Sequence, residues 1–93
     1  MRLTETERNV IKQGARRLDP AARVYLFGSR INDEALGGDI DLLIDSEVFD
    51  LERVAELRWE LMEKLGEQKF DIIVSSQANQ AFVATIRSSA VEL

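Results

Sequence analysis

The sequence predicts an α+β domain in which a small mixed β-sheet is flanked by helices. Apolar residues recur at helical spacing in three segments, at residues 5–18, 51–65 and 78–87. Between these segments lie short runs of strand-forming residues, at residues 23–27, 40–45 and 69–74. Strands interleaved with helices are typical of a sheet covered by helices. Because 93 residues allow one domain, we expect a single domain over residues 1–93.

The N-terminal half begins with a capping box in which Thr4 is the N-cap and Glu7 its partner. The helix that follows ends near Pro20, and its inward stripe consists of Val10, Ile11, Ala15 and Leu18. The first strand, RVYLF, stops at Gly28. Residues 29–36 are expected to form a loop or a short helix that two glycines end, before the second strand, IDLLID.

In the C-terminal half, Asp50 is expected to cap a helix that ends at Gly66. Its predicted buried stripe consists of Leu51, Val54, Ala55, Leu61, Met62 and Leu65. The third strand is KFDIIV. The inward residues expected of the last helix are Ala78, Phe82, Val83 and Ile86, and residues 90–93 can add a short edge strand.

The outer side of the helix at 51–65 carries an aromatic residue and several acids. We expect Trp59 to flank the core, with an interface anchor as the alternative. A solvated acidic face is expected from Glu52, Glu56, Glu60 and Glu63, in which Glu60 forms a supporting pair with Lys64.

Composition excludes several kinds of chemistry. The chain has no cysteine and no histidine, which removes thiolate sites, cysteine nucleophiles and the commonest general base. Catalysis must therefore use carboxylates, hydroxyls, Arg, Lys and backbone amides. The net charge of −5 argues against direct nucleic-acid binding, and with no apolar run long enough for a membrane span we expect a cytoplasmic protein. Eight carboxylates and no basic residue lie between residues 31 and 52, a pattern that a bound cation would explain.

A candidate phosphate site follows the first strand. Gly28 lets the backbone approach a ligand, Ser29 adds a hydroxyl and Arg30 a positive charge. Amides at the start of a helix favour an anion such as phosphate. The alternative is a simple tight turn.

Candidate metal ligands lie in the next two strands. Asp39 and Asp41 alternate with core residues, so both carboxylates share one face, as Mg²⁺ would require. The alternative is a solvated strand end. Asp71 lies within an apolar strand, where a buried charge is costly unless it is paired or metal-bound. Asp71 can line up with the other two if the strands are neighbours; the alternative is an edge strand with Asp71 in water.

Together these motifs resemble the DNA polymerase beta-like nucleotidyltransferase superfamily, and in particular the minimal nucleotidyltransferase (MNT) domains that occur beside HEPN-domain proteins. The pattern is LFGSR, then DIDLLID, then KFDIIV, and the resemblance extends from about residue 3 to the end. The combined motif is far more specific than its parts. The resemblance implies the polymerase beta-like nucleotidyltransferase fold.

The resemblance also implies roles for individual residues. Gly28, Ser29 and Arg30 would hold the triphosphate of a nucleotide, ATP. Asp39 and Asp41 would hold two Mg²⁺ ions, and Asp71 would be the third carboxylate, near the acceptor hydroxyl. The expected reaction is transfer of AMP to a hydroxyl of a partner HEPN toxin, for which the chain would be the antitoxin.

One departure from the family concerns positive charge. Many relatives have another basic residue soon after Gly-Ser-Arg, whereas residues 31–34 here are Ile-Asn-Asp-Glu. The negative charge of the phosphates would have to be balanced by Arg30, metal ions, backbone amides or a partner chain.

Other classes of function fit the sequence less well. A phosphatase of the haloacid dehalogenase type needs a hydrophobic strand before the first Asp and a longer chain. A P-loop needs a Gly-Lys-Ser/Thr continuation. The remaining alternative is a non-catalytic antitoxin that keeps the nucleotidyltransferase fold and neutralises its partner by occupancy.

Overall fold

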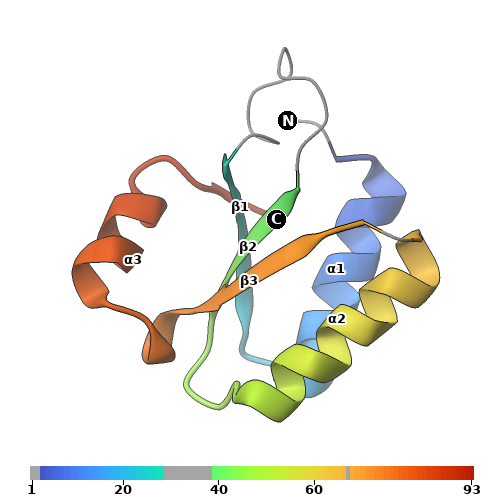
Figure 1. Cartoon of the computed structure of the whole chain (residues 1–93), viewed down its shortest axis with the longest axis horizontal. Coiled ribbons are helices and arrows are strands. Elements are labelled where there is room, and N and C mark those ends of the chain that lie inside the picture. Colours follow the sequence, from blue (N-terminus) through green and yellow to red (C-terminus); the bar gives the residue numbers. More distant parts are fainter. Residues whose placement is uncertain (1–2, 29–38, 67) are drawn as a thin grey trace.

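The computed structural model describes residues 3–28, 39–66 and 68–93, in which a sheet separates two helices on one face from a third helix on the other (Figure 1). The elements in chain order are α1 (Glu5–Leu18), β1 (Arg23–Phe27), β2 (Ile40–Asp45), α2 (Leu51–Leu65), β3 (Phe70–Val74), the 3₁₀ helix η2 (Ser75–Gln77), α3 (Gln80–Arg87) and β4 (Val91–Glu92). The predicted α+β class with flanking helices is confirmed. The expected loop or short helix at residues 29–36 and the two glycines after it lie outside the described residues.

The sheet has the strand order β3-β2-β1-β4. β1 is antiparallel to β2 and to β4, whereas β2 and β3 are parallel, so the sheet is mixed as predicted. The short strand expected near the end of the chain is β4, at one edge of the sheet. Since β1 runs opposite to β2 and β3, its C-terminal end meets their N-terminal ends.

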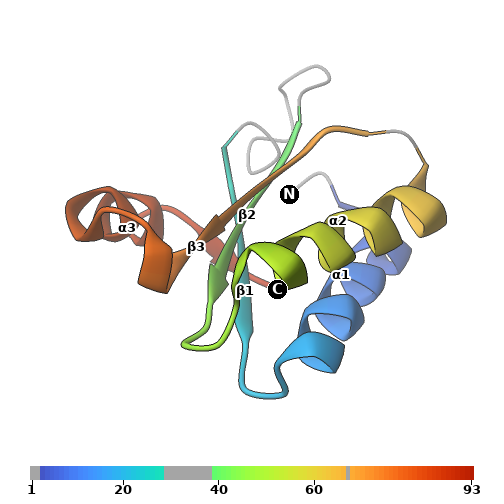
Figure 2. The ribbon, with the colours of Figure 1, turned by 60° about the horizontal axis from the view of Figure 1, so that its bottom comes forward.

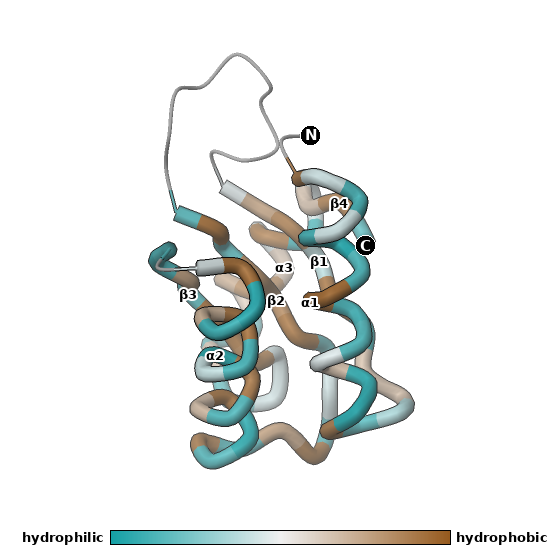
Figure 3. Tube along the Cα trace, turned by 90° about the vertical axis from the view of Figure 1, so that its right-hand side faces the viewer, coloured by the Kyte–Doolittle hydropathy of each residue, from teal (hydrophilic) through white to brown (hydrophobic). Residues whose placement is uncertain are grey.

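The core lies mainly between the sheet and the helices α1 and α2 (Figure 2). Alternate residues of each strand point to this side, as the period of a strand requires; they include Leu26, Leu42 and Val74. A smaller cluster on the other face joins Leu43 of β2 to Val83 and Ile86 of α3. Hydropathy along the chain follows this division, with apolar strands in the middle and mixed helices outside (Figure 3).

The predicted ends of the first two helices are confirmed. Thr4 and Glu7 form the reciprocal capping box of α1. The Asp50 carboxylate accepts a hydrogen bond of 2.9 Å from the backbone N–H of Arg53. α2 ends at Gly66, whose φ of +88° lies in the left-handed region that favours glycine. In the part of the chain that the structure describes, no helix is long and apolar enough to cross a membrane.

The predicted buried stripe of α2 is partly wrong. Val54, Leu57 and Leu61 are buried, so Leu57 was missed, whereas Leu51, Ala55 and Met62 are exposed. The reason is the close packing of α1 against α2 at Gly14, where an added Cβ would lie 2.9 Å from Leu57 Cδ1. This contact turns Leu57 inward and leaves the opposite flank of the apolar surface in solvent.

Three further expectations are corrected on the helices. Trp59 is 65% exposed and therefore does not flank the core. Glu60 is not part of a solvated face, because its carboxylate lies between Arg17 and Lys64 with 16% of its side chain exposed. The last helix begins at Gln80 after the η2 turn. Phe82 is 49% exposed rather than inward, because the side of α3 that packs on Leu43 is that of Val83 and Ile86.

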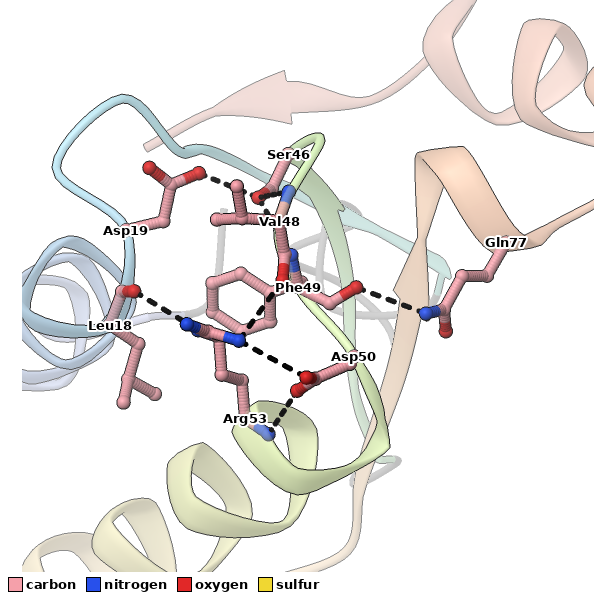
Figure 4. Close-up of polar contacts among 8 residues, drawn as sticks. All are labelled: Leu18, Asp19, Ser46, Val48, Phe49, Asp50, Arg53 and Gln77. Carbon is pink, nitrogen blue, oxygen red and sulfur yellow. Dashed lines mark hydrogen bonds and ion pairs between the residues drawn. The ribbon is translucent and has the colours of Figure 1, made fainter.

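A polar network fastens the end of the sheet where β2 ends (Figure 4). Ser46 Oγ donates a hydrogen bond of 2.6 Å to Oδ2 of the buried Asp19. Arg53 donates to the carbonyl oxygens of Leu18 and Val48, which ties α2 to the end of α1 and to the preceding loop. Side-chain hydrogen bonds stabilise this end of the sheet, and the candidate site residues predicted from the sequence lie at the opposite end.

Candidate active site

Three neighbouring strands bring the predicted site residues to one end of the sheet. Gly28 directly follows β1, while Asp41 and Asp71 are the second residues of β2 and β3. Phe27 pairs with Asp41 across the antiparallel ladder, and Asp41 pairs with Asp71 across the parallel one. Neighbouring strands are about 4.8 Å apart, so the two carboxylates are adjacent. The expected alignment of Asp71 with the second strand is therefore present.

The carboxylates lie on the face of the sheet that α3 covers only in part. Two residues beyond Asp41 on the same face is Leu43, which packs against Val83 and Ile86 of α3. Asp41 and Asp71 are one step outside this packed region and are half-buried. The arrangement leaves both carboxylates accessible to a ligand while an apolar wall borders them on one side.

Partial burial, together with neighbouring carboxylates, raises the pKa of Asp41 to about 6 from an ordinary value of 3.8. The largest cause is partial burial, which disfavours the charged form. A hydrogen bond with the Asp71 side chain and the charges of Asp71 and Asp39 add to it, and Lys69 opposes it. The raised pKa of Asp41 means that positive charge is lacking around its carboxylate, and a metal ion or a proton would supply it.

Asp39, the third predicted carboxylate, lies just before β2 and faces a lysine. Its Oδ2 is 3.7 Å from Nζ of Lys69, and both side chains are substantially exposed. Such a pair is weak and easily rearranged. The sequence interpretation had overlooked Lys69, although strand alternation offered a signal, because Lys69 lies two residues before Asp71 on the same face.

Gly28 forms the wall of the site opposite Asp41. Its φ is +79°, a conformation that other residues adopt at a cost. A Cβ added at this position would overlap Oδ2 of Asp41 and lie 3.0 Å from its Cγ. Only glycine therefore lets the end of β1 lie against the carboxylate. Ser29 and Arg30, the other predicted phosphate contacts, lie outside the described residues.

The oxygen donors at this end of the sheet suit Mg²⁺. In proteins this ion is commonly held by one or two carboxylates, with water and substrate phosphates completing its shell. The candidate ligands are the three predicted carboxylates, of which Asp41 and Asp71 are adjacent and Asp39 faces Lys69. Among residues 3–28, 39–66 and 68–93, no group of three or more acidic side chains is by itself arranged to hold a metal ion.

The fold and this arrangement of carboxylates define a nucleotidyltransferase domain. The family described as Polymerase beta, Nucleotidyltransferase matches residues 9–93. The chain belongs to this family.

A solved structure supports the same fold. The chain is similar, with a TM-score of 0.73 and 20% sequence identity, to a crystal structure of the toxin-antitoxin MntA-HpeT in a mutant form with two aspartates changed to glutamate. The match covers 92% of this chain and 70% of that one, and at this identity it shows a common fold. A comparison with curated proteins found no match.

Proposed function

We propose that this domain transfers AMP from ATP to a hydroxyl group of a partner HEPN-domain toxin, and that it thereby acts as an antitoxin. The observation that supports this most directly is the pairing of Asp41 with Asp71 beside Gly28. A glycine turn and adjacent carboxylates on one sheet end are what phosphate binding and phosphoryl transfer require. Membership of the nucleotidyltransferase family supports the reaction class.

Each residue has a distinct task in the proposed reaction. The backbone at Gly28, with Ser29 and Arg30, holds the triphosphate. Asp41 and Asp39 hold Mg²⁺, which when bound withdraws negative charge from the phosphates. Asp71 orients the acceptor hydroxyl and accepts its proton.

The bonds change in a single displacement. The acceptor oxygen forms a bond to the α-phosphorus, and the bond from that phosphorus to the β-phosphate oxygen breaks. Pyrophosphate leaves with the electron pair of the broken bond. The hydroxyl proton passes to the Asp71 carboxylate and then to solvent.

Lys69 offers a source of positive charge that the residues after Arg30 do not provide. Its ammonium group is at the site, and its pairing with Asp39 is long and exposed. If Asp39 were to hold a metal ion, the ammonium group of Lys69 would be available to a phosphate oxygen. This would compensate for the acidic residues at positions 33 and 34.

The test is intact-mass measurement of the partner after incubation with this chain, ATP and Mg²⁺, the partner being the product of the neighbouring gene. The wild type should add one or more AMP groups, and Asp71→Asn should reduce transfer by at least ~10²-fold because a positioned base is lost. Glu47→Gln, which removes one exposed carboxylate at the far end of the sheet, is the matched control and should be fully active.

A second candidate function is inhibition by occupancy without transfer. The exposed Trp59 favours it, because aromatic side chains are frequent anchors of protein interfaces. In that case the wild type silences its partner with no change in the partner's mass, and Asp71→Asn is as effective as the wild type. This outcome would overturn the catalytic proposal.

A further inference from the structure

The outer surface of α2 carries an apolar stripe that is separate from its core face. The stripe consists of Leu51, Ala55, Trp59 and Met62, which recur at helical spacing. Leu51 is 80% exposed, Trp59 65% and Met62 38%. The core side of the same helix is already buried through Leu57 and Leu61. A surface helix ordinarily has one apolar face, and a second one marks an interaction site.

An acidic row borders this stripe. It consists of Glu52, Glu56 and Glu63, all of them exposed. Within the described chain none of the three forms an ion pair, whereas Glu60 on the neighbouring side is paired with Arg17 and Lys64. Like charges four residues apart destabilise a helix, so the row has an energetic cost in the free domain.

Trp59 and two of these acids line a common hollow. Its volume is about 480 Å³, and it is also lined by Ala55, Arg17, Glu60 and Lys64. Glu60 is paired with both Arg17 and Lys64, which leaves the carboxylates of Glu56 and Glu63, among the residues that the structure describes, without an ion pair beside Trp59. An apolar centre with unpaired carboxylates beside it favours a partner surface that combines apolar anchors with positive charge. The negative charge therefore favours a positively charged occupant over an anionic one.

We propose that the α2 stripe and its acidic row dock an amphipathic helix of a partner protein whose polar side is rich in Lys and Arg. An antiparallel two-fold contact with a second copy would place acidic row against acidic row. Anionic lipid and nucleic-acid phosphates would be repelled by the same charges. A basic amphipathic helix of a protein matches both the apolar stripe and the acidic row of α2.

The position of the stripe connects it to the candidate active site. α2 ends at Leu65, and residues 66–69 lead directly to β3, in which Asp71 is the second residue. α2 lies on the opposite face of the sheet from Asp41 and Asp71, so a protein bound along α2 must extend past the C-terminal end of α2 to bring a hydroxyl to the carboxylates. This inference rests on the proposed function in taking the acceptor protein as the occupant.

Trp59 is the only tryptophan of the chain, so it reports on this surface directly. A chain labelled with 5-fluorotryptophan gives one ¹⁹F resonance, which should shift and saturate when the unlabelled neighbouring-gene product is added without ATP. Glu56→Lys combined with Glu63→Lys should weaken binding at least ~10-fold at low salt and less at high salt, because exposed charges are screened. The control is Glu47→Lys combined with Glu92→Lys, which makes the same change of charge at exposed positions on other elements.

The result decides between the possible occupants. Binding with an unchanged ¹⁹F resonance, or equal weakening by the control pair, would overturn the proposal. A shift that depends only on the concentration of the chain itself would assign the surface to a second copy, and a shift with phosphatidylglycerol vesicles would assign it to lipid.

Failure of this inference is distinguishable from failure of the proposed function. A mass increase of the partner with no ¹⁹F change rejects the docking surface alone. A ¹⁹F change with no mass increase rejects nucleotidyl transfer alone. If the wild type binds no partner, both are rejected.

Discussion

Replacing Asp41 by asparagine should change how the stability of the domain depends on pH. The pKa of Asp41 is raised in the folded chain to about 6, whereas in the unfolded chain it has its ordinary value of 3.8. Below 3.8 both states hold the proton, and the protonated side chain stabilises the fold fully. As the pH rises, the unfolded state releases the proton first, so the free energy of unfolding falls until the folded side chain has also ionised, above about 6.

The size of this effect follows from the two pKa values. Their difference corresponds to about 3 kcal/mol, and because Asp41 is partly exposed to water, which screens its charge, we expect about 1–2 kcal/mol. Asparagine cannot ionise and keeps nearly the same volume. The variant should therefore become more stable relative to the wild type by this amount between pH 4 and pH 7.

Urea denaturation of both proteins at pH 4, 5, 6 and 7, without divalent ions, measures the difference. Comparing the two proteins cancels the titration of groups that they share, such as Asp50, whose pKa is lowered. A difference in unfolding free energy that is the same at every pH would refute the account of a crowded carboxylate pair.

Three further predictions concern other parts of the structure. Mg²⁺ should raise the melting temperature of the wild type, because a ligand that binds only the native state stabilises that state. Asp41→Asn should lose most of this shift. An equal shift for the wild type and the variant in a thermal scan would contradict the metal site. Gly28→Ala should lower the free energy of unfolding by about 1–2 kcal/mol because of its left-handed φ, and further because the new Cβ overlaps Asp41. Gly66→Ala, with φ +88° and open space around it, should show only the first cost. Equal losses for the two variants in urea denaturation would contradict the close contact between Gly28 and Asp41. Ser46→Ala should cost about 1–3 kcal/mol by depriving the buried Asp19 carboxylate of a donor, and a change below about 0.5 kcal/mol in the same assay would show that this hydrogen bond is not needed.

Local sequence signals were sufficient for the ends of the first two helices and for the described strands. A capping box at Thr4, a carboxylate at Asp50 and a glycine at Gly66 act on backbone groups within a few residues, so they are legible without knowledge of the fold. Strand alternation likewise placed Asp41 and Asp71 on definite faces. These signals require no knowledge of which element lies next to which.

The tertiary structure decided which of several apolar flanks is buried and which strands are neighbours. Apolar residues cover much of the surface of α2, and only its contact with α1 at Gly14 selects Leu57 for the core and leaves Trp59 in water. The parallel register of β2 and β3 then makes adjacent two carboxylates that are thirty residues apart in the chain. Burial and charge proximity depend on distances between distant segments, and for that reason the raised pKa of Asp41, the role of Gly28 and the free face of α2 emerge only when the chain is folded.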